Sequence, residues 1–198
     1  LKYYVNGYLD KTINIGTGSF DDSTTSFIAM AYTMNINFYE LRITTNHSRY
    51  TTTYEPKQLE WPDNELAFDQ YKIINLPFKQ YTSDNQSVLS FTNTNVSLST
   101  DESLNGTKSA YFNNSKIVSN SKLLITNEKF TIEMFYKPKV ESLTGVVSIV
   151  SILNSFRLGT KEGLLSFFNG TTWEDSTYLL DDKKFNHIVI QRTGSTIK

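Results

Sequence analysis

Apolar and polar residues alternate along several short stretches of this chain. In "FTIEMFY", every second residue from Phe130 to Tyr136 is apolar, and Glu133 lies between two of them. Successive side chains of a β-strand point to opposite faces, so the pattern predicts a strand with one face in the core. We expect Glu133 to be a surface or sheet-face residue without a catalytic partner, whose replacement by Gln changes stability by no more than ~0.5 kcal/mol.

The stretch "NFYELRITT" alternates in the same way, which places Tyr39, Leu41 and Ile43 in the core. Glu40 and Arg42 are then expected to point outward. The stretch "VVSIVSILNSF" is apolar almost throughout, which indicates a central strand covered on both faces.

The same reading applied to the whole chain predicts an all-β protein. No stretch keeps a 3.6-residue period long enough for a domain-scale helix. The fifteen candidate strands indicate a two-sheet antiparallel jelly-roll sandwich rather than a single small barrel. They are residues 2–5, 8–15, 26–33, 36–44, 88–92, 109–112, 116–118, 123–125, 129–137, 145–152, 155–158, 164–168, 177–179, 186–192 and 196–198.

The dipeptide Asn6-Gly7 predicts a β-hairpin close to the start of the chain. It lies between two β-prone runs, and a type I′ turn needs positive φ at both of its central residues. A domain seldom opens on an interior hairpin, and Leu1 is not an initiator methionine. We therefore expect the start to be a cut, with the sheet neighbour of the hairpin elsewhere.

Composition narrows the functional classes. The 198 residues carry a formal net charge of −1 with Lys and Arg scattered along the chain, which argues against nucleic acid as a partner. Cysteine is absent, which removes disulfides, thiolate metal sites and cysteine nucleophiles. No apolar run approaches the ~20 residues of a membrane-spanning helix. The abundance of Asn, Ser, Thr, Tyr and Phe is typical of an exposed, external β protein.

Candidate catalytic groups are few. His47 lies in a loop and His187 on the polar face of a predicted strand, and we expect structural roles for both. Glycoside hydrolases of jelly-roll folds use two acids that project from one strand, and neither Glu133 nor Glu40 has an acidic partner two or four residues further on. The sequence therefore predicts a protein that is not an enzyme.

Two acidic pairs could supply oxygen ligands to calcium, the one cofactor that the sequence suggests. They are Asp21-Asp22 in "GSFDDST" and Asp181-Asp182 in "LLDDKK". Neither pair belongs to a D-x-D-x-D-G loop, and as turn residues they need no metal.

An exposed aromatic residue beside loop polar groups is typical of sugar binding, because sugar rings stack their apolar faces on Trp and Tyr. The stretch "FNGTTWEDSTY" has this character. The candidate carbohydrate-binding residues are Trp173, Asn169, Asp175 and Tyr178. Trp173 could equally be a hairpin-edge residue folded over the sheet.

Four stretches together resemble a known family. "SAYFNNSKIVSNSKLLITNEKFTIEMFYKP" resembles the opening of concanavalin A-like, laminin-G-type jelly rolls, and "FNHIVIQRTGSTIK" resembles a later strand, with Phe185 at a position where Trp is usual. "YYVNGYLDKTINI" resembles the hairpin that follows, and "INFYELRITTNHSRYTTTYEP" is similar to the closing strand of modules in bacteriophage tail and virion proteins.

The family order, however, runs from about residue 84 to 198 and then from 1 to 56. The resemblance therefore implies one sandwich formed by 1–56 and 84–198 in permuted order, or a chain cut between two modules. In the permuted sandwich, the strand 186–192 would flank the first hairpin, and Lys198 would lie near Leu1. Residues 57–83, broken by prolines and rich in acids, are interpreted as a connector with a short helix around 64–70.

The resemblance implies a non-enzymatic surface module that binds a cell-surface glycan, in a bacteriophage virion, tail-fibre or adhesin-like protein. A purely structural virion component, for capsid decoration or tail assembly, is the second reading, and its partners would be other virion subunits. A polysaccharide-cleaving enzyme is the third, because this sandwich hosts all three functions. We expect a virion or extracellular surface location, within a larger assembly or a homo-oligomer.

Overall fold

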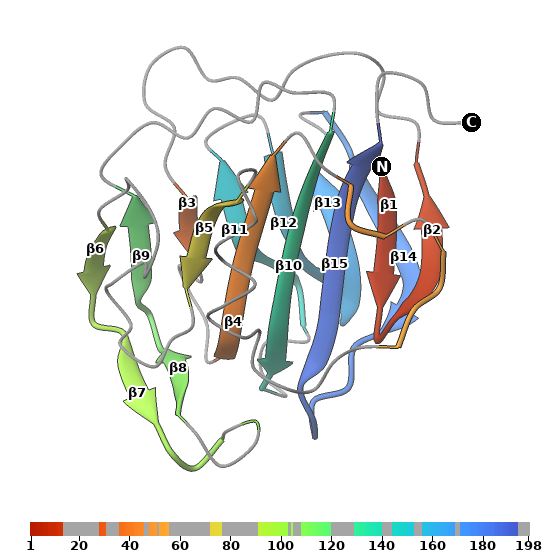
Figure 1. The fold of residues 1–198 in the computed structure, drawn as a ribbon. Helices are drawn as coiled ribbons and strands as arrows, with labels where there is room; N and C mark the ends of the chain where they lie inside the picture. Colours follow the sequence, from red (N-terminus) through yellow and green to blue (C-terminus); the bar gives the residue numbers. More distant parts are fainter. Residues whose placement is uncertain are drawn as a thin grey trace.

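The fold is an all-β sandwich of two antiparallel sheets that face each other (Figure 1). The predicted all-β class and the sandwich of two antiparallel sheets are therefore confirmed, whereas the jelly-roll topology stays a prediction. No helix occurs among the residues described. The computed structural model of the chain describes residues 1–13, 28–30, 36–45, 48–50, 52–55, 72–76, 91–102, 104, 108–119, 129–139, 144–152, 156–168 and 171–193.

The first sheet has eight described strands. In spatial order they are β2 (Tyr8–Thr12), β1 (Lys2–Val5), β15 (Asn186–Thr193), β10 (Lys129–Pro138), β4 (Ile36–Thr45), β8 (Ser109–Phe112) and β7 (Ser97–Ser99), with β5 (Lys72–Leu76) also paired to β4. The second sheet has seven, in the order β14 (Trp173–Leu179), β13 (Leu164–Phe168), β12 (Phe156–Lys161), β11 (Val146–Ile152), β3 (Ile28–Met30), β9 (Lys116–Ser119) and β6 (Phe91–Thr94).

The core lies between the two sheets. Alternate residues of β10, from Phe130 to Tyr136, are fully buried there, as their spacing predicts. They join Leu158 of β12 and Phe167 of β13 in one apolar cluster. Each such side chain contributes roughly 1.5–3 kcal/mol when it leaves water, so this cluster is the main stabilising feature of the fold.

The prediction for Tyr39 is wrong because β4 contains a β-bulge. The register pairs Met134 with Leu41 but Tyr136 with Phe38, so β4 has one residue more than β10 over this interval. A bulge reverses the alternation beyond it. Phe38 therefore takes the core position, and Tyr39 lies on the outer face of the first sheet in contact with Phe135.

The remaining predictions for β4 follow the alternation. Leu41 and Ile43 are buried in the core. Arg42 lies on the outer face, as expected, but it is only 5% exposed because other residues cover it there. The side chain of Glu40 lies outside the described residues.

The first hairpin finds its missing neighbour in β15, as predicted. β1 pairs antiparallel with β15, and Tyr3 lies opposite Ile190. Strands of ranges 1–56 and 84–198 lie side by side in both sheets. Residues 194–198 lie outside the described part, so the permuted order and the closeness of Leu1 to Lys198 stay predictions.

Two short strands were not predicted. β5 lies inside the range interpreted as a connector and pairs with β4, and β7 pairs with β8. The helix expected around 64–70 falls outside the described residues. β11 lies between β3 and β12, which agrees with the predicted central position. Val146 of β11 is 52% exposed, however, so the outer face of this strand is only partly covered.

Candidate binding site

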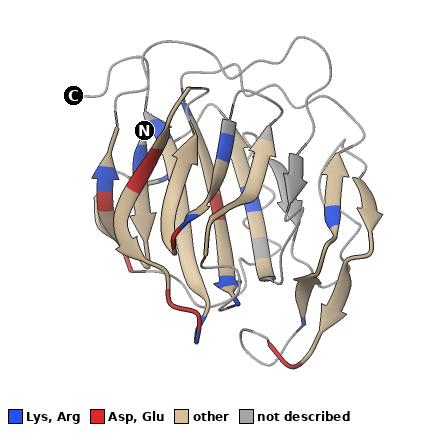
Figure 2. Ribbon diagram, turned by 180° about the vertical axis from the view of Figure 1, so that it is seen from behind, with Lys and Arg blue, Asp and Glu red and all other residues tan. Residues whose placement is uncertain are grey.

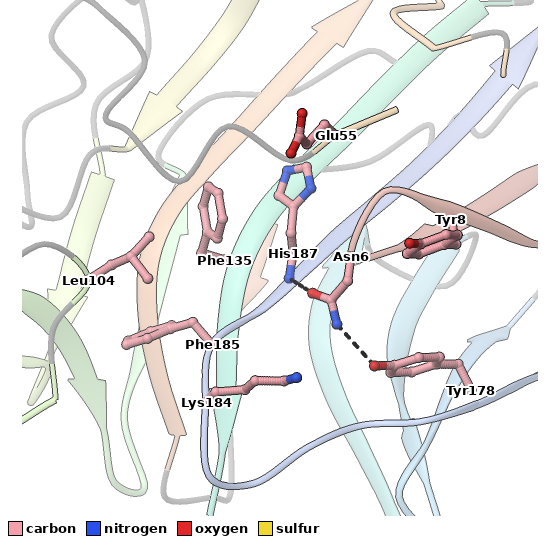
Figure 3. Close-up of a pocket in the computed structure, with 9 residues that line it drawn as sticks. All are labelled: Asn6, Tyr8, Glu55, Leu104, Phe135, Tyr178, Lys184, Phe185 and His187. Carbon is pink, nitrogen blue, oxygen red and sulfur yellow. Dashed lines mark hydrogen bonds between the residues drawn. The ribbon is translucent and has the colours of Figure 1, made fainter. Parts of the chain in front are cut away.

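A half-open pocket of about 730 Å³ lies where the first hairpin meets the start of β15 (Figure 3). Both sheets contribute to it, together with a segment, 52–55, that crosses the outer face of the first sheet. The residues that line it are Asn6, Tyr8, Glu55, Leu104, Phe135, Tyr178, Lys184, Phe185 and His187.

Asn6 ties the two sheets together at the pocket. It has φ of 50° and is followed by Gly7 with φ of 86°, the positive pair that the Asn-Gly turn predicts. Its side-chain oxygen accepts a hydrogen bond from the backbone nitrogen of His187 at 2.8 Å, and its amide nitrogen donates to the Tyr178 hydroxyl at 3.0 Å (Figure 3). The Tyr178 hydroxyl proton has no acceptor among the described residues, so it remains available to a ligand.

One wall of the pocket is apolar. Phe135 and Tyr39 form an edge-to-face pair with ring centroids 6.2 Å apart, and Phe185 packs on Tyr39 at 6.3 Å. Leu104 completes this cluster, which lies on the outer face of the first sheet and apart from the main core. Tyr8, on the other side of the pocket, is 70% exposed. The pocket therefore offers ring surfaces on two sides.

The turn before β15 carries the cationic side of the pocket. Asn186 is buried and orders this turn, because its amide nitrogen donates to the carbonyl oxygen of Asp181 at 2.7 Å. Lys184 projects from it with 61% of its side chain exposed, and its Nζ lies 3.5 Å from a carboxylate oxygen of Asp181. Glu55 contributes an exposed carboxylate on the opposite side.

Behind the pocket lies a buried polar network centred on Glu133, a residue only 1% exposed. Arg42 donates to one carboxylate oxygen from its Nε at 3.1 Å and also from a terminal nitrogen. The other oxygen accepts from the Tyr50 hydroxyl at 2.6 Å and lies 2.9 Å from Nε2 of His187. Glu133 therefore lies on a face of the sheet, one of the two expected alternatives, but it is buried and not at the surface. None of these partners is a second acid.

Electrostatics keep this carboxylate charged. Burial alone raises the pKa of Glu133, but the Arg42 guanidinium and hydrogen bonds from His187 and Tyr50 outweigh it and lower the pKa to about 2. Burial raises the pKa values of Tyr50 and Tyr54, and the charge of Glu133 raises both further. Both phenols therefore keep their protons at neutral pH and can act as donors.

His187 uses both ring nitrogens inside the protein. Its Nδ1 lies 3.1 Å from the Tyr54 hydroxyl, while Nε2 faces Glu133. The Glu133 carboxylate can only accept, so Nε2 donates to it, while Nδ1 is hydrogen-bonded to the Tyr54 hydroxyl. Neither nitrogen then faces a ligand. The ring presents carbon atoms to the pocket, which agrees with the structural role expected for His187.

The predicted sugar-binding residues separate in space. Tyr178, near the end of β14, lines the pocket, whereas Trp173 and Asp175 lie earlier on the same strand beside Phe168 and Ser166 of β13. Asp175 accepts hydrogen bonds from Ser166 and Lys161, at 2.9 Å and 3.0 Å. Asn169 lies outside the described residues.

No metal-binding cluster of three or more His, Asp or Glu side chains occurs in the part of the chain that the structure describes. Asp181 instead accepts a hydrogen bond from the Lys183 backbone at 2.8 Å, which is the largest influence lowering its pKa. This is the bond of a turn residue. Asp182 is its half-exposed neighbour, and Asp21 and Asp22 fall outside the described residues, as does His47.

The sequence did not indicate most of the pocket. The sequence predicts Asn6 only as a turn residue and Phe185 only as the counterpart of a usual Trp, yet both line the pocket. One signal was available in the sequence. The resemblance predicts that the first hairpin lies beside the strand 186–192, which brings Asn6 close to His187.

Comparisons with protein-family models, with curated proteins and with solved structures find no match to this chain. Among the described residues, no helix is long and apolar enough to cross a membrane.

Proposed function

We propose that this chain is a non-enzymatic recognition module that binds a glycan in the pocket between the first hairpin and β15. The observation that carries the proposal is the division of the pocket into ring surfaces, from Tyr8 and Phe185, and polar groups, above all the Tyr178 hydroxyl. Sugars combine apolar ring faces with hydroxyl groups and are bound by such combinations.

The pocket chemistry favours binding over cleavage. Glycosidases need a pair of carboxylates, and among the described residues that line the pocket Glu55 alone carries one. His187 has both nitrogens engaged, and Glu133 lies buried behind it. Neither is placed to transfer a proton to a ligand.

The resemblance to concanavalin A-like modules of bacteriophage tail and virion proteins supports a setting for this activity. In that setting the module belongs to a virion, a tail fibre or an adhesin-like protein and meets a cell-surface glycan. A purely structural virion component would have the same fold and no ligand. Binding measurements separate the two.

The test is a glycan array followed by titration of the tightest glycan into wild type and Y178F. The substitution removes one hydroxyl and leaves the ring, so we expect affinity to fall about 3- to 10-fold, the effect of one hydrogen bond. Y111F is the matched control, because Tyr111 lies on β8, away from the pocket, and it should bind like wild type. No bound glycan, or equal affinity of Y178F and wild type, contradicts the proposal.

A further inference from the structure

Three side chains form a row on the outer face of the second sheet, and none of them lines the pocket. Arg157 of β12 pairs with Phe168 of β13, and Phe168 pairs with Trp173 of β14. Their chain neighbours Leu158 and Phe167 are buried in the core, so the three face the other way. Directly paired residues on one face lie side by side across the strands.

Each side chain of the row contacts the next. The Arg157 guanidinium carbon lies 5.5 Å from the centroid of the Phe168 ring, which is the geometry of a cation–π contact. The rings of Phe168 and Trp173 follow at 5.5 Å between centroids, tilted by 46°. All three residues are half-buried, so each keeps part of its surface open. The row crosses two strand spacings, roughly 10 Å.

Arg157 and Lys161 lie on the same face of β12 and differ in their ion pairs. Lys161 pairs with Asp175, with Nζ 3.0 Å from a carboxylate oxygen. Arg157 has no ion pair with any residue that the structure describes. The cation–π contact with Phe168 needs no hydrogen-bond acceptor, and the guanidinium carries five N–H donors in its plane. They therefore remain able to hold a carboxylate with two parallel hydrogen bonds.

We propose that this row binds an acidic polysaccharide, with a sugar ring on Trp173 and Phe168 and the carboxylate of a uronic acid on Arg157. Figure 2 shows acidic and basic residues interspersed over the described strands, so a local pair rather than a broad positive field would hold the anion. Phe168 and Arg157 lie on interior strands and Trp173 on the edge strand β14, so a peptide added as a strand at that edge would run beside Trp173 alone. The row shares no residue with the pocket, so the inference stands independently of the proposed function.

The test is calorimetric titration of the full chain with tetragalacturonate and with its methyl ester, which keeps the rings and removes the charges. We expect the acid to bind at millimolar or lower concentration and the ester at least about tenfold more weakly, as for the loss of a charge-assisted hydrogen bond. R157Q should lose the preference for the acid. W173L should weaken both ligands, because the ring surface is lost.

Two controls separate this surface from others. K161Q removes a cation that is already paired and should bind like wild type, and Y178F should too, since Tyr178 belongs to the pocket. R157K keeps the charge without the planar fork and should bind between wild type and R157Q. Absence of tetragalacturonate binding, equal affinity for the ester, or equal binding of a glutamate-rich peptide of the same charge overturns the proposal.

Discussion

Glu133 shows how one side chain supports both the fold and the pocket. It holds Arg42, His187 and Tyr50 together on the outer face of the first sheet, in a place that water does not reach. A buried ion pair adds little over an apolar pair of the same shape, but removal of one partner leaves an uncompensated charge. Glu133 and Arg42 must therefore be replaced together if neither charge is to be left buried without its partner.

We therefore expect E133Q to lower the free energy of unfolding by about 3–5 kcal/mol, because Arg42 then stays buried without its counterion. This corrects the small effect expected for a surface position. The same substitution at Glu174, whose side chain is 36% exposed and 3.8 Å from Lys11, should cost less than ~1 kcal/mol. Denaturant unfolding measures both. A double variant, E133Q with R42M, should recover part of the loss, and a further loss would contradict this account.

The pKa of Glu133 predicts a loss of stability in acid. Its folded value of about 2 lies below the ordinary 4.5, so the group stabilises the fold fully above pH 4.5, and this contribution disappears as pH falls toward 2. A shift of this size corresponds to about 3 kcal/mol. Unfolding measured between pH 6 and pH 2 should show this decline in wild type and a flatter profile in E133Q. Parallel profiles would show that Glu133 is not the group responsible.

At the scale of single elements, the alternation of apolar and polar residues predicts a strand well where the strand pairs with its neighbours without a bulge. β10 and β15 lie where predicted, and β1 and β2 follow from the Asn-Gly turn. The bulge in β4 was not predictable, because an extra residue depends on the partner strand and not on local composition. β5 lies in a range broken by prolines and is followed directly by Pro77, and β7 has the sequence Ser-Leu-Ser with a single apolar residue, so neither stands out as a strand.

Gly159 tests the packing of β12 against β11. A Cβ at this position would overlap the carbonyl oxygen of Val147 and lie 3.0 Å from its carbonyl carbon, beside the register shift of β11. Both atoms belong to the backbone, so the strands must separate. We expect G159A to reduce the free energy of unfolding by about 1–3 kcal/mol, the usual cost of overpacking. S151A, on the same strand pair, is the control and should stay within ~0.5 kcal/mol. Equal stability of G159A and S151A would refute the close packing.

At the scale of the whole molecule, side chains close the sandwich beside the pocket. β2 and β14 are the edge strands of the two sheets, and Asp10 accepts a hydrogen bond from the Thr177 backbone at 3.0 Å across the gap. Lys11 donates to the carbonyl oxygen of Asp175 at 2.6 Å. The segment that follows β4 crosses the first sheet, and the Tyr54 backbone donates to the carbonyl oxygen of Gly7 at 2.9 Å.

This arrangement explains why the site could not be read from the sequence. Asn6, Phe135 and His187 come from three distant parts of the chain and meet only after β15 has paired with β1 and β10. The aromatic and amide residues were visible as sequence features, but their neighbours were not. Trp173, the most conspicuous candidate, is the first residue of β14, whereas Tyr178 near the end of the same strand lines the pocket.

The most direct test of glycan recognition in the pocket is an amide chemical-shift titration of the isotope-labelled chain with the tightest glycan from the array. We expect the largest shifts at Asn6, Tyr178, Phe185 and His187, with smaller shifts for the described residues far from the pocket. The same titration with Y178F should need higher glycan concentrations for equal shifts. Shifts confined to other surfaces, or none at saturating glycan, would contradict it.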